Sequence, residues 1–311
     1  MRVSSKWIAT TILSIIVLAV ASVYIFIPSR LFVSTVVKAN CNVIAASRTI
    51  NNKQWRNAFY AHTDSSFLLN GYSYTVADPL YNAADINISH NEDQYRTHIM
   101  FIKLSEDSCM VRWTTTIAAG NSPLSRITSY SKAVALKRNM EEVTGQLQSY
   151  WRNSKNIYGY NITHTTLTDT FLVSIKQEKR SQPSISDIYA LVNDLKSYIK
   201  KQGATETNYP MLNITFTGNS FETMVGIPVN KTLPAYSNIY PKRLSPIKDK
   251  ILTTDVQGGP ATIRQAYQQI ELYMNDHSLA APVIPFEFMI TDRSKEADTS
   301  KWLTKIFYPI I

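Results

Sequence analysis

Charged residues are scarce in this chain of 311 residues. Asp, Glu, Lys and Arg together make up 18% of it, against 44% for apolar residues. This composition excludes an intrinsically disordered chain, which needs high charge and low hydrophobicity. The length leaves room for two domains. The net charge is +9, but the basic residues are scattered, so we expect a solvated basic surface.

Cysteine is nearly absent. The two cysteines, Cys41 and Cys109, form no CxxC pair and stand in no zinc-ligand spacing, and the five histidines are dispersed. A structural zinc site is therefore not expected, and we predict no metal and no cofactor. A single disulfide in an oxidising compartment and two buried thiols remain equally open.

The common catalytic signatures are also missing. The sequence contains no GxSxG, no P-loop, no HExxH and no GxGxxG at the start of a helix. We therefore predict no catalytic residues, and favour binding over enzymatic activity without excluding the latter.

One long run without charge lies near the N-terminus. No charged residue occurs between Lys6 and Arg30. Residues 7–27, at ~1.5 Å per helical residue, are long enough to cross a hydrocarbon layer of ~30 Å. Trp7 and Tyr24, near the ends of this run, are residues that prefer the membrane interface. The pattern predicts one transmembrane helix.

The apolar run continues past the small residues at 19–22, which favours an uncleaved anchor, residues 1–29, over a signal peptide. Basic residues are nearly balanced on its two sides, so the positive-inside rule decides little. A short N-terminal tail before a large soluble part favours export of that part. We expect a single-pass protein of the inner membrane with its soluble domains in the periplasm.

Residues 30–155 predict an antiparallel sheet closed by a long helix. A strand at 32–39 and a short helix at 43–49 come first, and a helix at 129–152 ends the region with apolar residues spaced four and three apart. The strand at 95–104 is apolar on both faces, so we expect it to be buried on both. The runs predicted as strands between these helices are Phe67–Val76, Ala83–Ser89, Tyr95–Leu104 and Cys109–Ala118.

This order of elements resembles the polyketide-cyclase/START-like (SRPBCC) superfamily and its helix-grip fold. The segment VKANCNVIAASRTINNKQW sits where such proteins, behind a similar anchor, have a strand, a helix and a loop ending in tryptophan. The usual Ala-Pro after the first strand is here Asn40–Cys41–Asn42. The resemblance implies an apolar cavity between sheet and helix that would hold a lipid or a second ligand. A cavity filled by side chains, which makes the domain a spacer, is equally open.

Residues 156–311 look like one β-α-β-β unit written twice, so the predicted fold class is α+β. An offset of 75 residues carries Pro210 onto Pro285 and maps one helical apolar stripe onto the other. The alternative is two unrelated α+β segments that happen to have prolines at similar positions. The predicted elements are Leu167–Ile175, Ser184–Lys201, Pro210–Thr217 and Thr223–Val229 in the first copy, and Ile251–Val256, Ala261–Asn275, Pro285–Thr291 and Trp302–Ile310 in the second.

The segments PFEFMITDR, SKEADTSKW and LTKIFYPI resemble the end of the gyrase-inhibitor-like (GyrI-like), or AraC-type effector-binding, domain. In that family a Gly-Pro opens the helix and a Trp-x-Thr-Glu-Ile-aromatic-x-Pro pattern closes the chain. The matching residues here are Gly259–Pro260, Trp302, Thr304, Ile306 and Pro309. The resemblance implies a groove between the two halves that binds a small, often aromatic or cationic, molecule.

Lys305 stands at the glutamate position of that pattern. A lysine would repel a cation, so we do not expect a cationic ligand. Lys305 suits an anionic or neutral ligand, or points to solvent, and Glu287 on the neighbouring predicted strand is placed to neutralise it. Asp292–Arg293 suggests a salt bridge within a turn. The candidate ligand-binding residues are Phe171, Tyr189, Tyr267, Phe286, Glu287, Phe288, Trp302, Lys305 and Phe307, although the aromatic residues among them equally suit a core.

Taken together, these patterns predict a membrane-anchored protein that binds an amphipathic or aromatic small molecule without catalysis. A small-molecule hydrolase or cyclase is the first alternative, and Glu287 and Glu222 are then the strand carboxylates to test. A protein-interaction module is the second. Nothing before residue 156 resembles a helix-turn-helix, so no nucleic-acid partner is expected.

Overall fold

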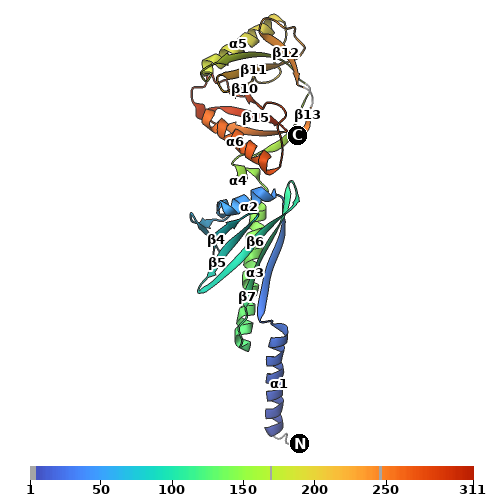
Figure 1. The fold of residues 1–311 in the computed structure, drawn as a ribbon, viewed down its shortest axis with the longest axis vertical. Helices are drawn as coiled ribbons and strands as arrows, with labels where there is room; N and C mark the ends of the chain where they lie inside the picture. The colour runs from blue at the N-terminus through green and yellow to red at the C-terminus, as the bar shows by residue number, and fades with distance from the viewer. Residues whose placement is uncertain (1–4, 169, 245–246) are drawn as a thin grey trace. The chain divides into compact units, whose positions relative to one another are not determined.

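The computed structural model describes residues 5–168, 170–244 and 247–311. The chain divides into two compact units, the first ending at Asn153 and the second beginning at Ser154. In the described residues there are six α-helices and two antiparallel sheets, one of seven strands and one of eight (Figure 1). The protein is therefore of mixed α+β class.

Helix α1, Ser5–Phe26, is apolar along its length. Its window Ala9–Phe26 has a mean hydropathy of 2.3, and none of that window is buried. The helix is long and apolar enough to cross a membrane by length and composition, a test that signal sequences near an N-terminus also pass.

The sheet of the first unit runs in the order β1-β7-β6-β5-β4-β3-β2, and α2 (Val43–Asn51), a 3₁₀ turn (Gln54–Ala58) and α3 (Pro123–Trp151) complete the unit. The predicted strand at 67–76 is instead a hairpin. Asn70 and Gly71 both adopt positive φ, of 51° and 79°, and such a pair makes a tight two-residue turn. The strands are β1 Arg30–Ala39, β2 Ala61–His62, β3 Ser66–Leu69, β4 Tyr72–Leu80, β5 Ala83–His90, β6 Asp93–Ser105 and β7 Ser108–Ala118.

Aromatic side chains fill much of the space between this sheet and its helices. Phe67 stacks on Phe59 and on Tyr74, with ring centroids 3.7 and 4.7 Å apart, and Trp55 meets Phe67 edge-on. The indole of Trp113 donates a hydrogen bond within the sheet, and its nitrogen is fully buried. These rings form an aromatic core on one side of the sheet.

Strand β6 is buried on one face only, contrary to expectation. Ile99 and Phe101 face the helices and are buried, whereas Met100 between them is 40% exposed. Successive side chains of a strand point to opposite faces, and α2 packs against β6. Apolar residues on both faces of a strand therefore did not mean two covered faces.

In the second unit the sheet runs β12-β9-β11-β10-β14-β15-β13-β8. A strand–helix–strand–strand order occurs twice, as β9-α5-β10-β11 and as β13-α6-β14-β15, and the two sets meet where β10 pairs with β14. The bounds are α4 Ser154–Tyr158, β8 Thr163–Leu167, β9 Thr170–Lys179, α5 Ile185–Lys201, β10 Met211–Phe216, β11 Phe221–Val229, β12 Ile239–Leu244, β13 Ile247–Gln257, α6 Pro260–Asp276, β14 Phe286–Met289, a 3₁₀ turn Thr299–Lys301 and β15 Leu303–Pro309.

Local signals start both helices of this unit. Ser184 and Asp187 form a capping box at the start of α5, in which each side chain accepts a hydrogen bond from the backbone N–H of the other residue. Helix α6 has Pro260 in its first turn, after Gly258 with φ of 143°. A Cβ on Gly258 would lie 2.7 Å from Thr262 Oγ1, so this position requires glycine.

The second sheet has two different faces. One packs against α5, where Val173, Val225 and Met289 join the helix residues Val192 and Leu195 in a buried cluster. The other carries a separate cluster of Leu172, Met211, Ile251, Phe286, Phe288 and Phe307. Because strand residues alternate, each position along β14 and β15 is assigned to one of these faces.

Candidate functional site

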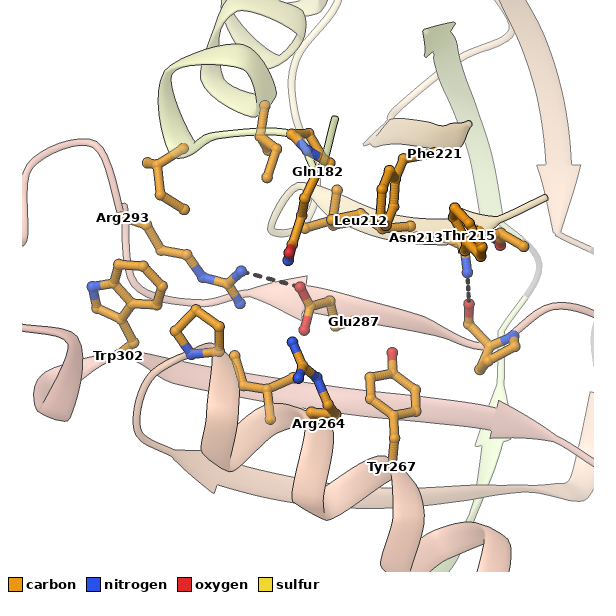
Figure 2. A pocket seen from close by; sticks show the side chains of 18 of the residues that line it. Gln182, Leu212, Asn213, Thr215, Phe221, Arg264, Tyr267, Glu287, Arg293 and Trp302 are labelled. Carbon is orange, nitrogen blue, oxygen red and sulfur yellow. Dashed lines mark hydrogen bonds and ion pairs between the residues drawn. The ribbon is translucent and has the colours of Figure 1, made fainter. Parts of the chain in front are cut away.

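A pocket of about 780 Å³ lies on the helix-bearing face of the second sheet, within the range of small-molecule sites. Both halves of the unit build it (Figure 2). The first half contributes apolar walls, chiefly Ile185 and Ile188 from α5, Leu212 from β10 and Phe221 from β11. The first half also contributes the neutral polar side chains of Gln182, Asn213 and Thr215. The second half contributes Ile263 and all the charged groups, and its polar lining residues are Arg264, Tyr267, Glu271, Glu287, Arg293 and Trp302.

Glu287 is the most deeply buried carboxylate of the pocket, with only 6% of the residue exposed. Its Oε1 accepts a hydrogen bond from Nη1 of Arg293 at 3.0 Å. Its Oε2 is buried and meets no hydrogen-bond donor in the part of the chain that the structure describes. Burial raises the pKa of Glu287, and the charge and hydrogen bond of Arg293 oppose that rise without cancelling it.

Arg293 is held from several sides. Its Nη2 donates to Thr304 Oγ1 at 2.8 Å, and its guanidinium lies over the ring of Trp302 at 5.1 Å. The backbone N–H of Arg293 donates to the Tyr189 hydroxyl, and the Trp302 indole donates to the carbonyl of Glu296 at 2.9 Å. These contacts fix the loop after β14 over one end of the pocket, with the guanidinium beside Glu287 (Figure 2).

The predicted turn salt bridge at Asp292–Arg293 is wrong. Asp292 pairs with Lys295 at 3.4 Å and accepts hydrogen bonds from Ser294. Adjacent residues of the loop point apart, so Arg293 turns inward to Glu287 while Asp292 stays near the surface.

Helix α6 presents Arg264 and Tyr267 to the cavity from the side opposite Glu287 (Figure 2). Residues three apart share a helix face, which is why both reach the same space. Burial raises the pKa of Tyr267, and the nearby charge of Glu287 adds to the effect, so its hydroxyl is neutral. The pocket thus holds two carboxylates, two guanidinium groups and a neutral phenol.

Three of the residues predicted from sequence, Tyr267, Glu287 and Trp302, come together in this pocket. Tyr189 lies beside it and supports the loop through its bond to Arg293. Phe171 packs against the core under α5. Phe286, Phe288 and Phe307 pack on one another on the opposite face of the sheet, with centroids 4.8–5.9 Å apart.

Lys305 also lies on that opposite face, so Glu287 does not neutralise it. Lys305 pairs across strands with Phe288, whereas Glu287 pairs with Ile306, and the alternation of strands sends Glu287 and Lys305 to different sides. The ammonium of Lys305 lies 3.8 Å from Oδ1 of Asp255 instead. Glu222, the other carboxylate considered, pairs with Lys176 at 2.7 Å and is absent from the pocket lining.

Sequence reasoning missed Arg293, Arg264 and the apolar wall from the first half. One signal for a basic partner was present, because Glu287 stands in the apolar run PFEFM and a buried glutamate is seldom left without a cation. Nothing in the sequence indicated which of the 32 basic residues it would be. Ile188 and Leu212 carry only a core-like pattern.

A second, smaller cavity of about 380 Å³ lies on the opposite face. Leu172, Met211 and Phe286 line its floor, and Val283 and Ile284 are exposed at its edge. It is the cavity that the predicted residue Phe286 reaches.

Comparison with known proteins gives no match to a protein-family model and none to a curated protein. Among solved structures, the C-terminal domain of EcmrR is 18% identical over 49% of this chain and 98% of its own, with a TM-score of 0.42. A hydrolase from Listeria innocua is 9% identical over 48% and 92%, with a TM-score of 0.34. A transcription regulation protein from Staphylococcus aureus MU50 is 14% identical over 49% and 97%, with a TM-score of 0.30. Likeness at this level transfers neither a ligand nor an activity.

Proposed function

We propose that this protein binds an amphipathic or aromatic small molecule in the pocket between α5 and α6. The observation that carries the proposal is the buried Oε2 of Glu287, which faces a cavity of about 780 Å³ and has no donor among the described residues. Buried polar atoms are nearly always hydrogen-bonded, so such an atom in a cavity calls for a donor from a ligand or from water. Apolar walls with a few fixed polar groups suit small-molecule recognition.

The charges that line the pocket limit which class of ligand it can bind. Glu271 and Glu287 balance Arg264 and Arg293, so the lining carries no excess charge. The repulsion of cations expected from Lys305 does not act here, since that residue lies on the other face. A neutral or zwitterionic ligand with a donor for Glu287 and an acceptor for the unpartnered Nε of Arg293 fits best.

The wider organisation belongs to the same proposal. Helix α1 would act as a single-pass inner-membrane anchor, and both folded units would lie in the periplasm. The first unit would be a START-like helix-grip domain, and the two halves of the second would be copies of one ancestral unit in a GyrI-like effector-binding domain. The uninterrupted hydropathy of α1 and the repeated element order support this. An alkaline phosphatase fusion after Ile311 should be active, and an inactive fusion beside an active cytoplasmic reporter would reverse the topology.

Binding is tested on the full chain, purified in detergent. Native mass spectrometry identifies co-purified molecules, and a panel of neutral and zwitterionic amphiphiles is titrated while the fluorescence of Trp302 is followed. Trp302 lines the pocket and is the one tryptophan of the sequence after residue 151. A ligand that binds should alter its emission.

The matched pair of variants is Glu287→Gln and Glu222→Gln. Glutamine at 287 keeps the size of the side chain but loses the negative charge, so the affinity should fall by about 10-fold or more, as expected for a charged hydrogen bond worth about 1.5–3 kcal/mol. Glu222 is a carboxylate of the same unit outside the pocket, and its variant should bind as the wild type does. Equal affinities for the two variants would contradict the assignment of the pocket.

A hydrolase is the second candidate, and the raised pKa of Glu287 favours it. A carboxyl group whose pKa is raised is suited to general acid–base chemistry, and Tyr267 lies in the same cavity. Turnover of ester or epoxide probes that disappears in Glu287→Gln and persists in Glu222→Gln would establish this function in place of binding alone.

A further inference from the structure

The start of α3 carries apolar side chains that the protein itself does not cover. The first buried residue of this helix is Ala133, ten positions after its start at Pro123. Before and just after that point, Leu124, Ile127, Tyr130 and Val134 are 78%, 48%, 50% and 43% exposed. The first turns of α3 therefore extend beyond the core of the first unit (Figure 1).

These side chains form one stripe. At about 100° per residue they fall within an arc of about 120°, which also includes Ser131 and is centred about 160° away from the buried side of α3. The stripe is thus not an extension of the core-facing side. Exposed apolar residues gathered on one helix face indicate an interaction surface.

Contacts fix this part of α3 to the end of α1. The Tyr24 hydroxyl donates to the carbonyl of Asn121 at 2.8 Å, and Nη1 of Arg126 donates to the carbonyl of Ile27 at 2.7 Å. The guanidinium of Arg126 also lies over the Tyr24 ring at 4.5 Å. Residues 121–126 are therefore at the level of the last turn of α1.

We infer that the stripe formed by Leu124, Ile127, Tyr130 and Val134 inserts into the lipid surface that α1 crosses, at the boundary between headgroups and acyl chains. The inference rests on the proposed membrane anchor. If α1 spans the bilayer, Tyr24 and Ile27 lie at an interface, and the hydrogen-bonded start of α3 lies at the same depth. Apolar faces of helices insert about 5–10 Å at this boundary.

Arg126 supports a lipid partner over a protein one. Its Nε is buried and has no acceptor in the described part of the chain, although Nη1 is bonded. A lipid phosphate is an anion at the right depth, and guanidinium groups bind phosphate by paired, charge-assisted hydrogen bonds. The first unit would then be held close against the membrane by two contacts, α1 and the stripe.

Depth measurement on spin-labelled protein tests this in the full chain, reconstituted into vesicles of phosphatidylethanolamine and phosphatidylglycerol. Single cysteines replace Leu124 or Ile127, with Val17→Cys on α1 as the anchor control and Ser149→Cys near the far end of α3 as the water control. All four positions are exposed, so the fold should tolerate the label. The native Cys41 and Cys109 are buried, and unsubstituted protein reports any labelling of them.

Labels at 124 and 127 should be more accessible to oxygen than to a water-soluble nickel chelate, as at 17, whereas the label at 149 should show the reverse. Residues 124 and 149 are about 37 Å apart along the helix, so the two environments are well resolved. Water-like values at 124 and 127 with a lipid-like value at 17 would overturn the stripe and leave the anchor intact. A water-like value at 17 would remove the anchor and the stripe with it.

Discussion

The pair formed by Glu287 and Arg293 makes the sharpest stability prediction. The two side chains are 8% and 4% exposed, with Oε1 and Nη1 3.0 Å apart. Replacing Arg293 by Met leaves the carboxylate buried without a counter-charge. Because burial already raises the pKa of Glu287, its carboxyl group should bind a proton in this variant rather than stay ionised.

The size of the loss follows from that proton. In the unfolded chain Glu287 returns to its ordinary pKa of 4.5. Holding it protonated in the folded state costs about 1.4 kcal/mol for each pH unit above that value, hence at most about 3.4 kcal/mol at pH 7 and about 0.7 at pH 5. The folded state keeps a proton that the unfolded state releases, so the stability of Arg293→Met falls as pH rises. Losing the bond to Thr304 and the contact with Trp302 adds about 1–2 kcal/mol at every pH.

The reverse variant behaves differently. In Glu287→Met the buried guanidinium cannot lose its proton at any working pH, so a loss of about 3–5 kcal/mol is expected, and this loss should not grow as pH rises from about 5 to 8. The double variant, with Met at both positions, should recover much of the stability, since apolar replacement of a buried ion pair is often neutral.

Hydrogen exchange of peptides covering β14 and β15 measures the opening free energy, corrected for the intrinsic exchange rate at each pH. The reasoning fails if Arg293→Met loses the same stability at pH 5 and pH 8. It also fails if the double variant is as unstable as the two single losses combined.

Three further changes have expected outcomes. Gly258→Ala should destabilise the protein by more than about 1 kcal/mol, because Gly258 has a positive φ and a Cβ there would be crowded. Gly145→Ala, in open space on α3, should instead stabilise the protein by about 0.5–1 kcal/mol. Thermal melts that shift in the same direction for both variants would contradict this. Hydrogen bonding to Lys179 and Ser184 lowers the pKa of Asp187 to about 2. The contribution of this carboxylate to the stability of the fold is therefore present above pH 4 and lost as pH falls toward 2. The melting temperatures of wild type and Asp187→Asn should converge on acidification, and a constant difference between them would refute this. Burial raises the pKa of Cys109 to about 11, and Cys41 is buried as well. Ellman's reagent at pH 8 should therefore react with the two thiols only after the protein unfolds. Fast reaction of the folded chain would exclude their burial.

Much of the secondary structure was predictable because it is specified locally. The stripe of α3 through Leu136, Met140 and Leu147 is buried as its spacing predicted. Helix α5, predicted as Ser184–Lys201, spans Ile185–Lys201 with Ser184 as its N-cap, and the strand that follows each helix begins after the expected proline. The thiol alternative also holds for the cysteines, since both are buried and neither is in a disulfide.

The errors arose where two segments had to be placed against each other. The hairpin at Asn70–Gly71 is a different kind of miss, because Asn-Gly between two strand-forming runs is a local signal for a two-residue turn and was overlooked within one long apolar run. Lys305 was assigned to the site from a linear pattern, but its register with Phe288 sets it on the other face. The loop that brings Arg293 to Glu287 has no periodic pattern of apolar residues from which its conformation could be predicted.

Sequence alone determined the apolar N-terminal helix, the two α+β regions and the repeated order of elements in the second, because hydrophobic period, capping residues and prolines act over a few neighbouring residues. Because successive residues of a strand alternate, Phe286 and Glu287 have to point to opposite sides of β14, although both were predicted as contacts of one ligand. Which of those sides α5 and α6 would cover, and which cation would meet the buried carboxylate, was decided only by the packing of helices onto the sheet. Burial and charge pairing depend on groups that are distant along the chain, and they exist only once the chain has folded.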